Sequence, residues 1–341
     1  NLRTDAGHGE PVRIYEASTD GTEAAWMVDE IKSLINTGSA RSEIAILYRS
    51  NAQSRIIEHG LFSAGIPYRV YGGLRFFERA EIKHALAYLR LLENPNDDTS
   101  FARVVNFPTR GIGAKSVETL QDSAKVNNCS FYAAAPYLEG KAGSSIGAFV
   151  RLIDHMRDST RHFTLPETVD YVIQNSGLIQ HYLTEREGQD RVENLQELVN
   201  AATAFIAEEG FAQDTVAGTS QDEPMIEMSP LAGFLAHASL EAGDNQAQAG
   251  QDAVQLMTVH AAKGLEFTTV FITGLEEGLF PHENSVNEED GLEEERRLMY
   301  VAITRAKERL FLSHTQSRLL HGQVRYNLPS RFLDELPAES L

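Results

Sequence analysis

Two stretches decide the fold of this chain: VQLMTVHAAKGLEFTTVFITGLEEGLFP (residues 254–281) and LEEERRLMYVAITRAKERLFLS (residues 292–313). The first stretch holds two apolar runs rich in β-branched and aromatic residues, and the glycine-containing HAAKGLE segment separates them, so two buried strands are predicted. The second stretch has helical spacing up to about Arg305 and a further strand from Arg309. Strands that alternate with helices in this way predict a parallel α/β sheet.

The beginning of the chain shows the same alternation. Strand patterns occur at residues 11–17, 43–50 and 66–73, and a helical pattern follows each of them. The third of these helices is expected from about Glu78 to Leu92. Strand, helix and strand in this order and at these lengths again favour parallel pairing.

The middle of the chain has a different texture. Helical patterns dominate residues 101–249 and strand signals vanish there. The simplest topology is an α/β domain built from residues 1–100 and 250–341, interrupted by a helical insertion at 101–249. The polar, glycine-containing segment at 243–252 is interpreted as the return linker.

Composition narrows the class of protein. The chain has 341 residues and one cysteine, Cys129, so it can form no internal disulfide, which fits a reducing cytoplasm. No run of 18 apolar residues occurs, so no membrane association is expected and a cytoplasmic location is predicted. The eleven histidines show no regular ligand spacing, which argues against a metal site within this chain.

The charge distribution bears on nucleic-acid binding. The formal net charge is −19, which argues against broad, non-specific attraction to DNA. Acidic residues cluster at 208–228 and 283–295, whereas basic residues gather in YRSNAQSR, YRVYGGLRFFER and PTRGIG. A local basic track can therefore coexist with an acidic exterior.

The chain contains no GxxxxGK[ST] phosphate loop. GIGAKS, at 111–116, has the wrong glycine spacing and no strand directly before it. If the chain handles a nucleotide, the cradle for its phosphates comes from elsewhere. Together with a first residue that is not methionine, this leads us to expect a fragment of a longer protein.

Six strings carry a resemblance to a known family: AILYRSNAQSR, YRVYGGLRFFERAEIK, VVNFPTRGIG, RVENLQEL, VQLMTVHAAKGLEF and EEERRLMYVAITRA. They resemble superfamily 1 DNA helicases of the UvrD/PcrA/Rep type, in the same order and over nearly the whole chain. The resemblance implies a second RecA-like motor domain carrying a helical insertion. The first RecA-like domain, which holds the phosphate loop and most contacts to ATP and Mg²⁺, would lie upstream.

The resemblance also implies a nucleotide half-site. Arg305 would be the arginine finger that stabilises charge developing on the γ-phosphate, and Glu266 would contact the nucleotide sugar, with Gly264 allowing the tight turn before it. Judged from the residues, Arg305 at the edge of a sheet could bind a ligand, or it could merely satisfy a helix terminus. Glu266 could equally be a solvated loop acid.

DNA contacts are implied at several positions by the same resemblance. We expect Thr258, His260 and Lys263 to face the DNA track, so that one short loop would sense both DNA and nucleotide. The other residues expected to bind a single strand are Arg75, Phe76, Asn106 and His321. His321 stands where many relatives carry an aromatic residue that stacks on a base. The charges Glu293, Arg296 and Arg297 are interpreted as structural ion pairs of the helix before Arg305.

The segment TRGIGAKSVETL (109–120) resembles a turn between helices that binds duplex DNA. Exposed backbone N–H groups and a helix N-terminus can hold a phosphate without reading bases. The residues involved would be Thr109, Arg110, Gly111, Gly113 and Lys115. A tight turn with no ligand fits the spacing equally well.

These expectations combine into one prediction. The chain is interpreted as the C-terminal motor half of an ATP-dependent 3′–5′ DNA helicase that acts in DNA repair on single-stranded DNA and the single-strand/duplex junction. Its partners would be the N-terminal RecA-like domain of the same protein and repair proteins, and the half alone would be inactive. The alternatives are a non-catalytic DNA-binding or protein-interaction module and the motor part of a helicase–nuclease, although no nuclease motif follows residue 313.

Overall fold

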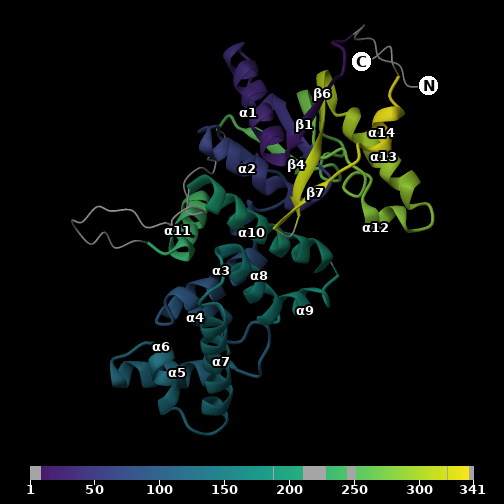
Figure 1. The fold of residues 1–341 in the computed structure, drawn as a ribbon. Helices are drawn as coiled ribbons and strands as arrows, with labels where there is room; N and C mark the ends of the chain where they lie inside the picture. The colour runs from purple at the N-terminus through teal and green to yellow at the C-terminus, as the bar shows by residue number, and fades with distance from the viewer. Residues whose placement is uncertain (1–8, 187, 210–227, 244–250, 321, 338–341) are drawn as a thin grey trace. The chain divides into compact units, whose positions relative to one another are not determined.

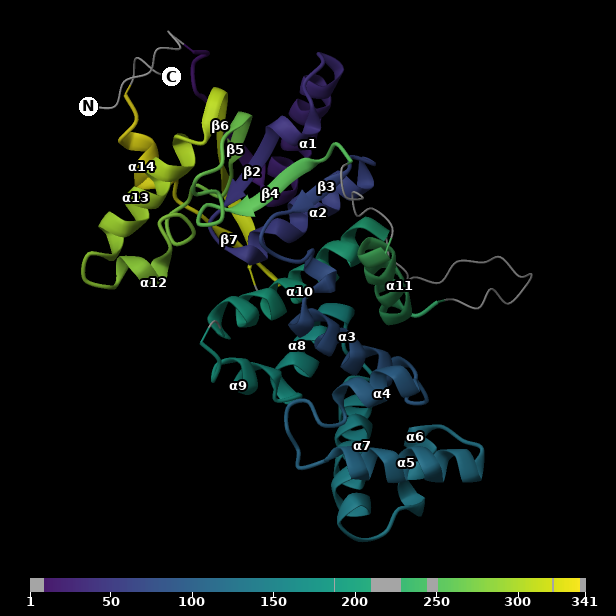
Figure 2. The ribbon, with the colours of Figure 1, turned by 180° about the vertical axis from the view of Figure 1, so that it is seen from behind.

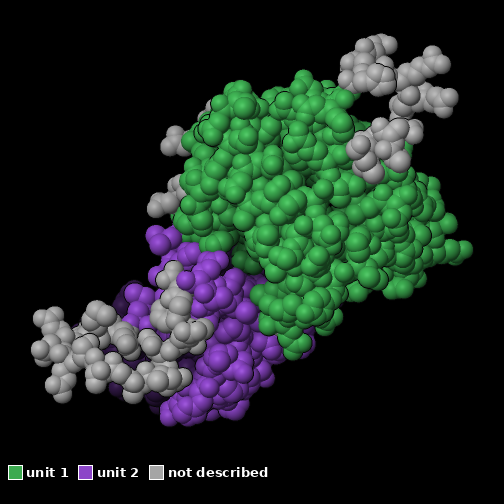
Figure 3. Space-filling model, turned by 45° about the horizontal axis from the view of Figure 1, so that its top comes forward, with its two compact units in different colours: residues 1–76, 241–341 green, residues 77–240 purple. Residues whose placement is uncertain are grey.

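The computed structural model describes residues 9–186, 188–209, 228–243, 251–320 and 322–337. The chain forms two compact units, one from residues 1–76 with 241–341 and one from residues 77–240, coloured separately in Figure 3. The crossings near 76 and 240 lie earlier in the chain than the sequence boundaries at 100 and 249. The physical reason is helix α3 (Ala80–Glu93), which packs against helices α4, α7, α8 and α10 of the second unit.

A mostly parallel sheet forms the centre of the first unit. Within the described residues it has seven strands in the order β1-β6-β5-β2-β4-β3, with β7 paired to β6. Every neighbouring pair along that path is parallel, as predicted, and β7 is antiparallel to β6. The strands are β1 (Arg13–Thr19), β2 (Ile44–Tyr48), β3 (Tyr68–Val70), β4 (Val254–Thr258), β5 (Phe267–Ile272), β6 (Ala306–Leu320) and β7 (Gln323–Tyr326).

Helices cover both faces of this sheet (Figures 1 and 2). They are α1 (Asp20–Asn36), α2 (Ser54–Ser63), α12 (Glu283–Val286), α13 (Gly291–Ile303) and α14 (Arg331–Asp334). On one face Ile31 of α1 and Leu61 of α2 join a core with strand residues such as Phe271. On the other face Met299 of α13 and Phe332 of α14 join a second core. Burial of these apolar side chains on both faces stabilises a three-layer α/β/α unit.

The last strands depart from the sequence prediction. The strand expected from Arg309 already begins at Ala306 and runs to Leu320. Strand β7, which was not predicted, pairs with the end of β6. All four residues of β7 are exposed, so its sequence has no alternation of buried and exposed positions by which a strand is recognised.

The second unit is helical, as predicted. No strand occurs in its described part, residues 77–186, 188–209 and 228–240. Its helices are α3, α4 (Asp98–Val104), α5 (Ala114–Asn127), α6 (Phe131–Ala134), α7 (Gly140–Ser159), α8 (Leu165–Asn175), α9 (Leu178–Tyr182), α10 (Gly188–Glu209) and α11 (Pro230–Gly243), which extends past the boundary at 240. Buried aromatic residues hold them together, and Phe101 packs edge-on against Phe149 with ring centroids 5.1 Å apart.

None of the helices in the described ranges is long and apolar enough to cross a membrane.

The parallel strands give the sheet two distinct edges. The carboxyl edge carries the ends of β2 and β4 at Tyr48 and Thr258. The amino edge carries the starts of β2, β5 and β6 at Ile44, Phe267 and Ala306. Helix α13 and the connection from β4 to β5, residues 259–266, both run from the carboxyl edge back to the amino edge.

Candidate functional site

Arg305 and Glu266 lie together at the amino edge. Arg305 directly precedes β6 and Glu266 directly precedes β5. The backbone N–H of Phe267 donates to the Arg305 carbonyl at 2.9 Å, and the Arg305 Nη1 donates to the Leu265 carbonyl at 2.8 Å. Arg305 therefore contacts both chain neighbours of Glu266. The two residues predicted to meet one nucleotide are adjacent in space.

Arg305 does not lie at the edge of the sheet where α/β proteins usually place ligand-binding residues. Open α/β sheets generally bind ligands at the carboxyl ends of their strands. Arg305 and Glu266 instead lie at the amino ends of β6 and β5. A nucleotide at these residues would thus approach the edge opposite to the one that the general rule favours.

The Arg305 guanidinium is folded back onto the protein. Its Nε donates to the Val301 carbonyl at 2.9 Å and its Nη2 donates to the Thr304 hydroxyl at 2.9 Å, in addition to the bond to Leu265. The side chain is half-buried. To meet a phosphate, the guanidinium would exchange these neutral acceptors for charged ones, which make stronger hydrogen bonds.

Glu266 is free to reach solvent. Its side chain is 68% exposed, and the Lys307 Nζ lies 3.9 Å from its Oε1. The same Nζ lies 3.9 Å from Glu43 Oε2 at the start of β2. A hydrogen bond from the Thr268 hydroxyl lowers the pKa of Glu43, helped by the Thr268 N–H and Lys307 and opposed by slight burial. The amino edge thus offers exposed carboxylates that can accept hydroxyl hydrogen bonds.

Gly264 has the backbone that was predicted for it. Its φ is +86°, a left-handed conformation in which a side chain is strained, although a Cβ would meet no atom within 4 Å. The glycine is therefore required by backbone conformation and not by space. It turns the chain toward Leu265 and Glu266 at the amino edge.

The residues expected to face DNA lie at the carboxyl edge. Thr258 ends β4, and His260 and Lys263 are exposed in the connection that follows. The N–H of Val259 donates to the Tyr48 carbonyl at 2.9 Å, which places this connection beside the end of β2. Thr258 and Glu266 consequently lie at opposite edges, joined by one short segment.

Arg75 and Phe76 are buried in this structure. Phe76 is 1% exposed and Arg75 is 5% exposed. The Arg75 guanidinium donates to the carbonyls of Glu241 at 3.2 Å and Ala242 at 2.5 Å, at the end of α11. Neither side chain presents a face to solvent, so in this conformation they support the surface and do not form it.

The same string exposes two residues that the sequence reading missed. Tyr71 is 47% exposed and Leu74 is 55% exposed. The Tyr71 N–H donates to the Leu256 carbonyl at 2.8 Å, next to the end of β4. Gly72 has a φ of +75°, and a Cβ added to it would lie 3.7 Å from the Ala261 Cβ, so the turn lies next to the connection that follows β4. The glycine pair was the available signal, because a turn after a strand exposes the residues on either side of it.

In the second unit, the TRGIG segment forms a turn between α4 and α5, as predicted. The Asn106 Oδ1 accepts from the N–H groups of Arg110 at 2.8 Å and Ile112 at 3.1 Å, so its amide holds the turn. The Arg110 Nη1 donates to the Pro108 carbonyl at 2.9 Å, and Nη2 donates to the Ser176 carbonyl at 2.8 Å. These contacts make Asn106 and Arg110 supports of the turn.

The other residues of this turn that were predicted to contact DNA are exposed. They are Thr109, Gly111, Gly113 and Lys115. Gly113 is the N-cap of α5, and no side-chain hydrogen bond caps the helix there. His321, the other residue expected to contact DNA, lies outside the described residues.

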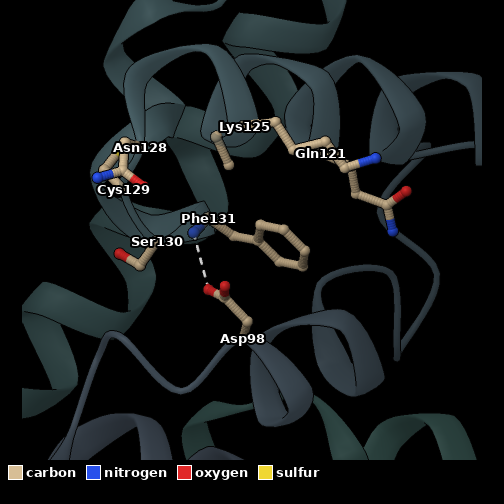
Figure 4. A pocket seen from close by; sticks show the side chains of 8 residues that line it. Asp98, Gln121, Lys125, Asn128, Cys129, Ser130 and Phe131 are labelled. Carbon is tan, nitrogen blue, oxygen red and sulfur yellow. Dashed lines mark hydrogen bonds between the residues drawn. The ribbon is translucent and has the colours of Figure 1, made fainter.

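The second unit also has an open hollow of about 750 Å³ beside α5 and α6 (Figure 4). Asp98, Lys125, Cys129 and Phe131 are among its lining residues, and the Phe131 N–H donates to Asp98 Oδ1 at 2.8 Å. None of the residues that the sequence predicted to bind a nucleotide or DNA is among the residues that line this hollow. We therefore do not count it as part of the candidate site.

Comparison with known proteins finds similarity to helicases over the length of the chain. The sequence model for the UvrD-like helicase C-terminal domain matches residues 1–317. DNA helicase II of Escherichia coli (strain K12) is 47% identical over 346 residues, which cover 99% of this chain and 46% of that protein. ATP-dependent DNA helicase PcrA of Bacillus subtilis (strain 168) is 37% identical over 349 residues, which cover 100% of this chain and 46% of the relative. The chain spans about half the length of the curated relatives it matches.

Proposed function

The chain belongs to the UvrD-like helicase C-terminal domain family, and we propose that it is the C-terminal motor half of an ATP-dependent DNA helicase. Its relatives carry the names DNA helicase II and ATP-dependent DNA helicase PcrA. The observation that carries the proposal is the pairing of Arg305 with the segment of Glu266 at one edge of the sheet. In this proposal the phosphate loop and the Mg²⁺ ligands belong to an N-terminal RecA-like domain of the same protein.

The residues at the amino edge suit a nucleotide. Exposed Glu266 can accept hydrogen bonds from ribose hydroxyls, and Arg305 can turn outward from the carbonyls of Val301 and Leu265. A guanidinium beside the γ-phosphate stabilises the charge of the transition state, and in related NTPases it raises kcat by a factor of about 10³ to 10⁵. Arg305 is accordingly proposed as the catalytic residue of this half, which alone would not hydrolyse ATP.

DNA would bind at the carboxyl edge and at the turn of the second unit. Thr258, His260 and Lys263 form the single-strand track, and exposed Tyr71 supplies an aromatic face on which a base can stack. Arg75 and Phe76 are buried, so in this proposal they support the turn that carries Tyr71 and do not contact DNA directly. At 109–115 the open helix N-terminus and Lys115 would hold a phosphate of the duplex near the junction.

Movement of the parent protein along DNA would follow closure of the cleft between the two RecA-like domains around ATP. Polarity from 3′ to 5′ and a role in DNA repair complete the proposal and rest on the family resemblance alone. The cytoplasmic location predicted from the composition belongs to the same proposal.

The test is ATP hydrolysis by the full-length parent protein with and without single-stranded DNA. Arg305→Ala should lower the DNA-stimulated kcat by about three decades or more while leaving DNA affinity nearly unchanged. Arg297→Ala is the matched control, because Arg297 lies on helix α13, which leads to Arg305, and pairs only with Glu294 among the described contacts, at 3.0 Å. Equal activity of wild type and Arg305→Ala would disprove the arginine-finger role. If wild type hydrolyses no ATP, the alternative of a non-catalytic DNA-binding module holds.

A further inference from the structure

A bidentate ion pair ties α13 to the carboxyl edge. The Arg49 Nε donates to both carboxylate oxygens of Glu295 at 3.0 Å, and its Nη2 donates to Oε1 at 2.7 Å. Glu295 is 1% exposed and Arg49 is 16% exposed. The backbone N–H of His282 also donates to Glu295 Oε2 at 3.0 Å, so the carboxylate is held from two sides.

The two ends of α13 serve the two edges of the sheet. Glu295 lies in the early part of this helix, close to the carboxyl edge, and Arg305 lies two residues beyond its last residue, Ile303, at the amino edge. Ile303 lies eight positions after Glu295, a span of roughly 12 Å along the helix. Because Met299 and Ala302 pack the helix against the sheet, it can transmit a displacement as one body.

Arg49 adjoins the segment proposed to touch DNA. It follows Tyr48, whose carbonyl accepts from the N–H of Val259 directly after Thr258. The Arg49 N–H itself donates to Gln53 Oε1 at 3.0 Å, which fixes the turn that follows β2. A DNA strand bound by Thr258 and His260 would therefore contact a segment that is hydrogen-bonded to the backbone just before Arg49, and a shift of that backbone would move the Arg49 guanidinium.

The chemistry of this pair demands arginine and a charged partner. Two parallel N–H donors match the two oxygens of a carboxylate, whereas a lysine ammonium offers a point charge and loses the fixed orientation. Although burial acts to raise it, the pKa of Glu295 lies below its usual value, because Arg49, the His282 N–H and Ser285 favour the charged form. The pair is thus charged under ordinary conditions and geometrically specific.

We propose that Arg49 and Glu295 are positioning residues that couple DNA binding at the carboxyl edge to the placement of Arg305 at the amino edge. The inference rests on the proposed function. Arg49 touches neither nucleotide nor reacting atoms in this account. Arg49 acts through α13, so its substitution should change the stimulation of ATP hydrolysis by DNA and leave the basal rate of hydrolysis unchanged.

The experiment measures ATP hydrolysis by the full-length parent protein as a function of an oligo-dT strand. Arg49→Lys and Glu295→Gln keep the side-chain size and remove the bidentate charge pair. We expect the ratio of DNA-stimulated to basal kcat to fall about tenfold in each, with the Kd for oligo-dT and the KM for ATP within about twofold of wild type. Arg296→Ala is the control, since Arg296 pairs with Glu293 and Glu335 on the exposed side of the same helix.

The outcomes separate this inference from the proposed function. If wild type shows DNA-stimulated hydrolysis that Arg305→Ala abolishes, the proposed function stands, and an unchanged stimulation ratio in Arg49→Lys then overturns the coupling role alone. A parallel loss of basal and stimulated turnover, or an equal effect of Arg296→Ala, would show a merely structural pair and also overturn it. If Glu295→Gln lowers the melting temperature strongly, Arg49→Lys supplies the decisive ratio, and the reverse holds as well.

Discussion

Replacement of Arg318 with methionine should destabilise the α/β unit severely. Arg318 is 8% exposed, and its guanidinium lies between two carboxylates that are 2% and 0% exposed, those of Glu23 and Glu276. The Nε donates to Glu276 Oε2 at 2.7 Å, and Nη2 donates to Glu276 Oε1 at 2.9 Å and Glu23 Oε2 at 2.5 Å. Although burial opposes it, these carboxylates raise the pKa of Arg318 above its usual value.

The size of the effect follows from what remains after the substitution. Removing one partner of a buried ion pair costs about 3–5 kcal/mol, because the remaining charge is left buried without compensation. Here two like charges would remain, with only neutral donors such as the Ser313 hydroxyl at 2.7 Å from Glu23 and the Thr315 N–H at 2.7 Å from Glu276. We therefore expect Arg318→Met to lower the free energy of unfolding by at least about 3 kcal/mol.

The single tryptophan provides a selective assay. Trp26 lies on α1, one turn from Glu23, and stacks on Tyr15 with ring centroids 4.2 Å apart. Equilibrium urea unfolding followed by its fluorescence therefore reports on the unit that contains the network. Arg331→Ala is the matched control, since Arg331 pairs with Glu277 at 2.6 Å but is 44% exposed, and exposed pairs contribute little.

Two results would refute this reasoning. One is an Arg318→Met protein that unfolds at the same urea concentration as Arg331→Ala. The other is a failure of Glu276→Gln, added to Arg318→Met, to recover part of the lost stability, because the neutral amide removes one of the two uncompensated charges.

Three further outcomes are expected. Burial, reinforced by Arg103, His181 and Arg191, lowers the pKa of His84 to about 4. As the pH falls, the unfolded chain, in which this histidine has a pKa of about 6.5, is protonated before the folded chain. The free energy of unfolding therefore falls between about pH 6.5 and pH 4, by at most about 2 kcal/mol at pH 5. Unfolding followed by circular dichroism should show this loss in wild type and not in His84→Gln. Gly264→Ala should cost about 1–2 kcal/mol through its positive φ, measured by urea unfolding, whereas Gly113→Ala, at the N-cap of α5 with an ordinary φ and open space, should cost less. Lys115→Ala should weaken duplex binding and reduce its salt slope by about one without changing the melting temperature, whereas Arg110→Met should lower the melting temperature.

Local signals in the sequence were sufficient for the alternation of strands and helices. The Thr19 hydroxyl caps α1 by accepting from the Thr22 N–H, and Gly38 ends the helix region with φ +98°. Such features depend on neighbours within a few residues, and they are therefore readable from the sequence. The apolar runs in β2, β4 and β5 predicted parallel strands for the same reason, since strands covered on both faces need continuous apolar residues.

The surroundings of the candidate residues could not be read in this way. Phe76 and Arg110 have side chains suited to DNA, but contacts distant in sequence bury the first and engage the second with the Ser176 carbonyl. The edge at which Arg305 lies depends on the direction of the whole sheet. The network around Arg318 joins residues from α1, β6 and the segment after β5, and its members show no common motif.

The position of the two edges constrains how this unit could link DNA to a nucleotide. Besides the strands themselves, residues 259–266 and helix α13 are two connections that lead from Thr258 and Arg49 on one side to Glu266 and Arg305 on the other. The first is short and exposed at Lys263 and Gly264, so it can absorb a displacement by changing its backbone angles. The helix is packed on the sheet and anchored by a buried ion pair, so it moves as a body. Gly264→Ala should consequently affect stability more than DNA stimulation of hydrolysis, and Arg49→Lys should show the reverse order.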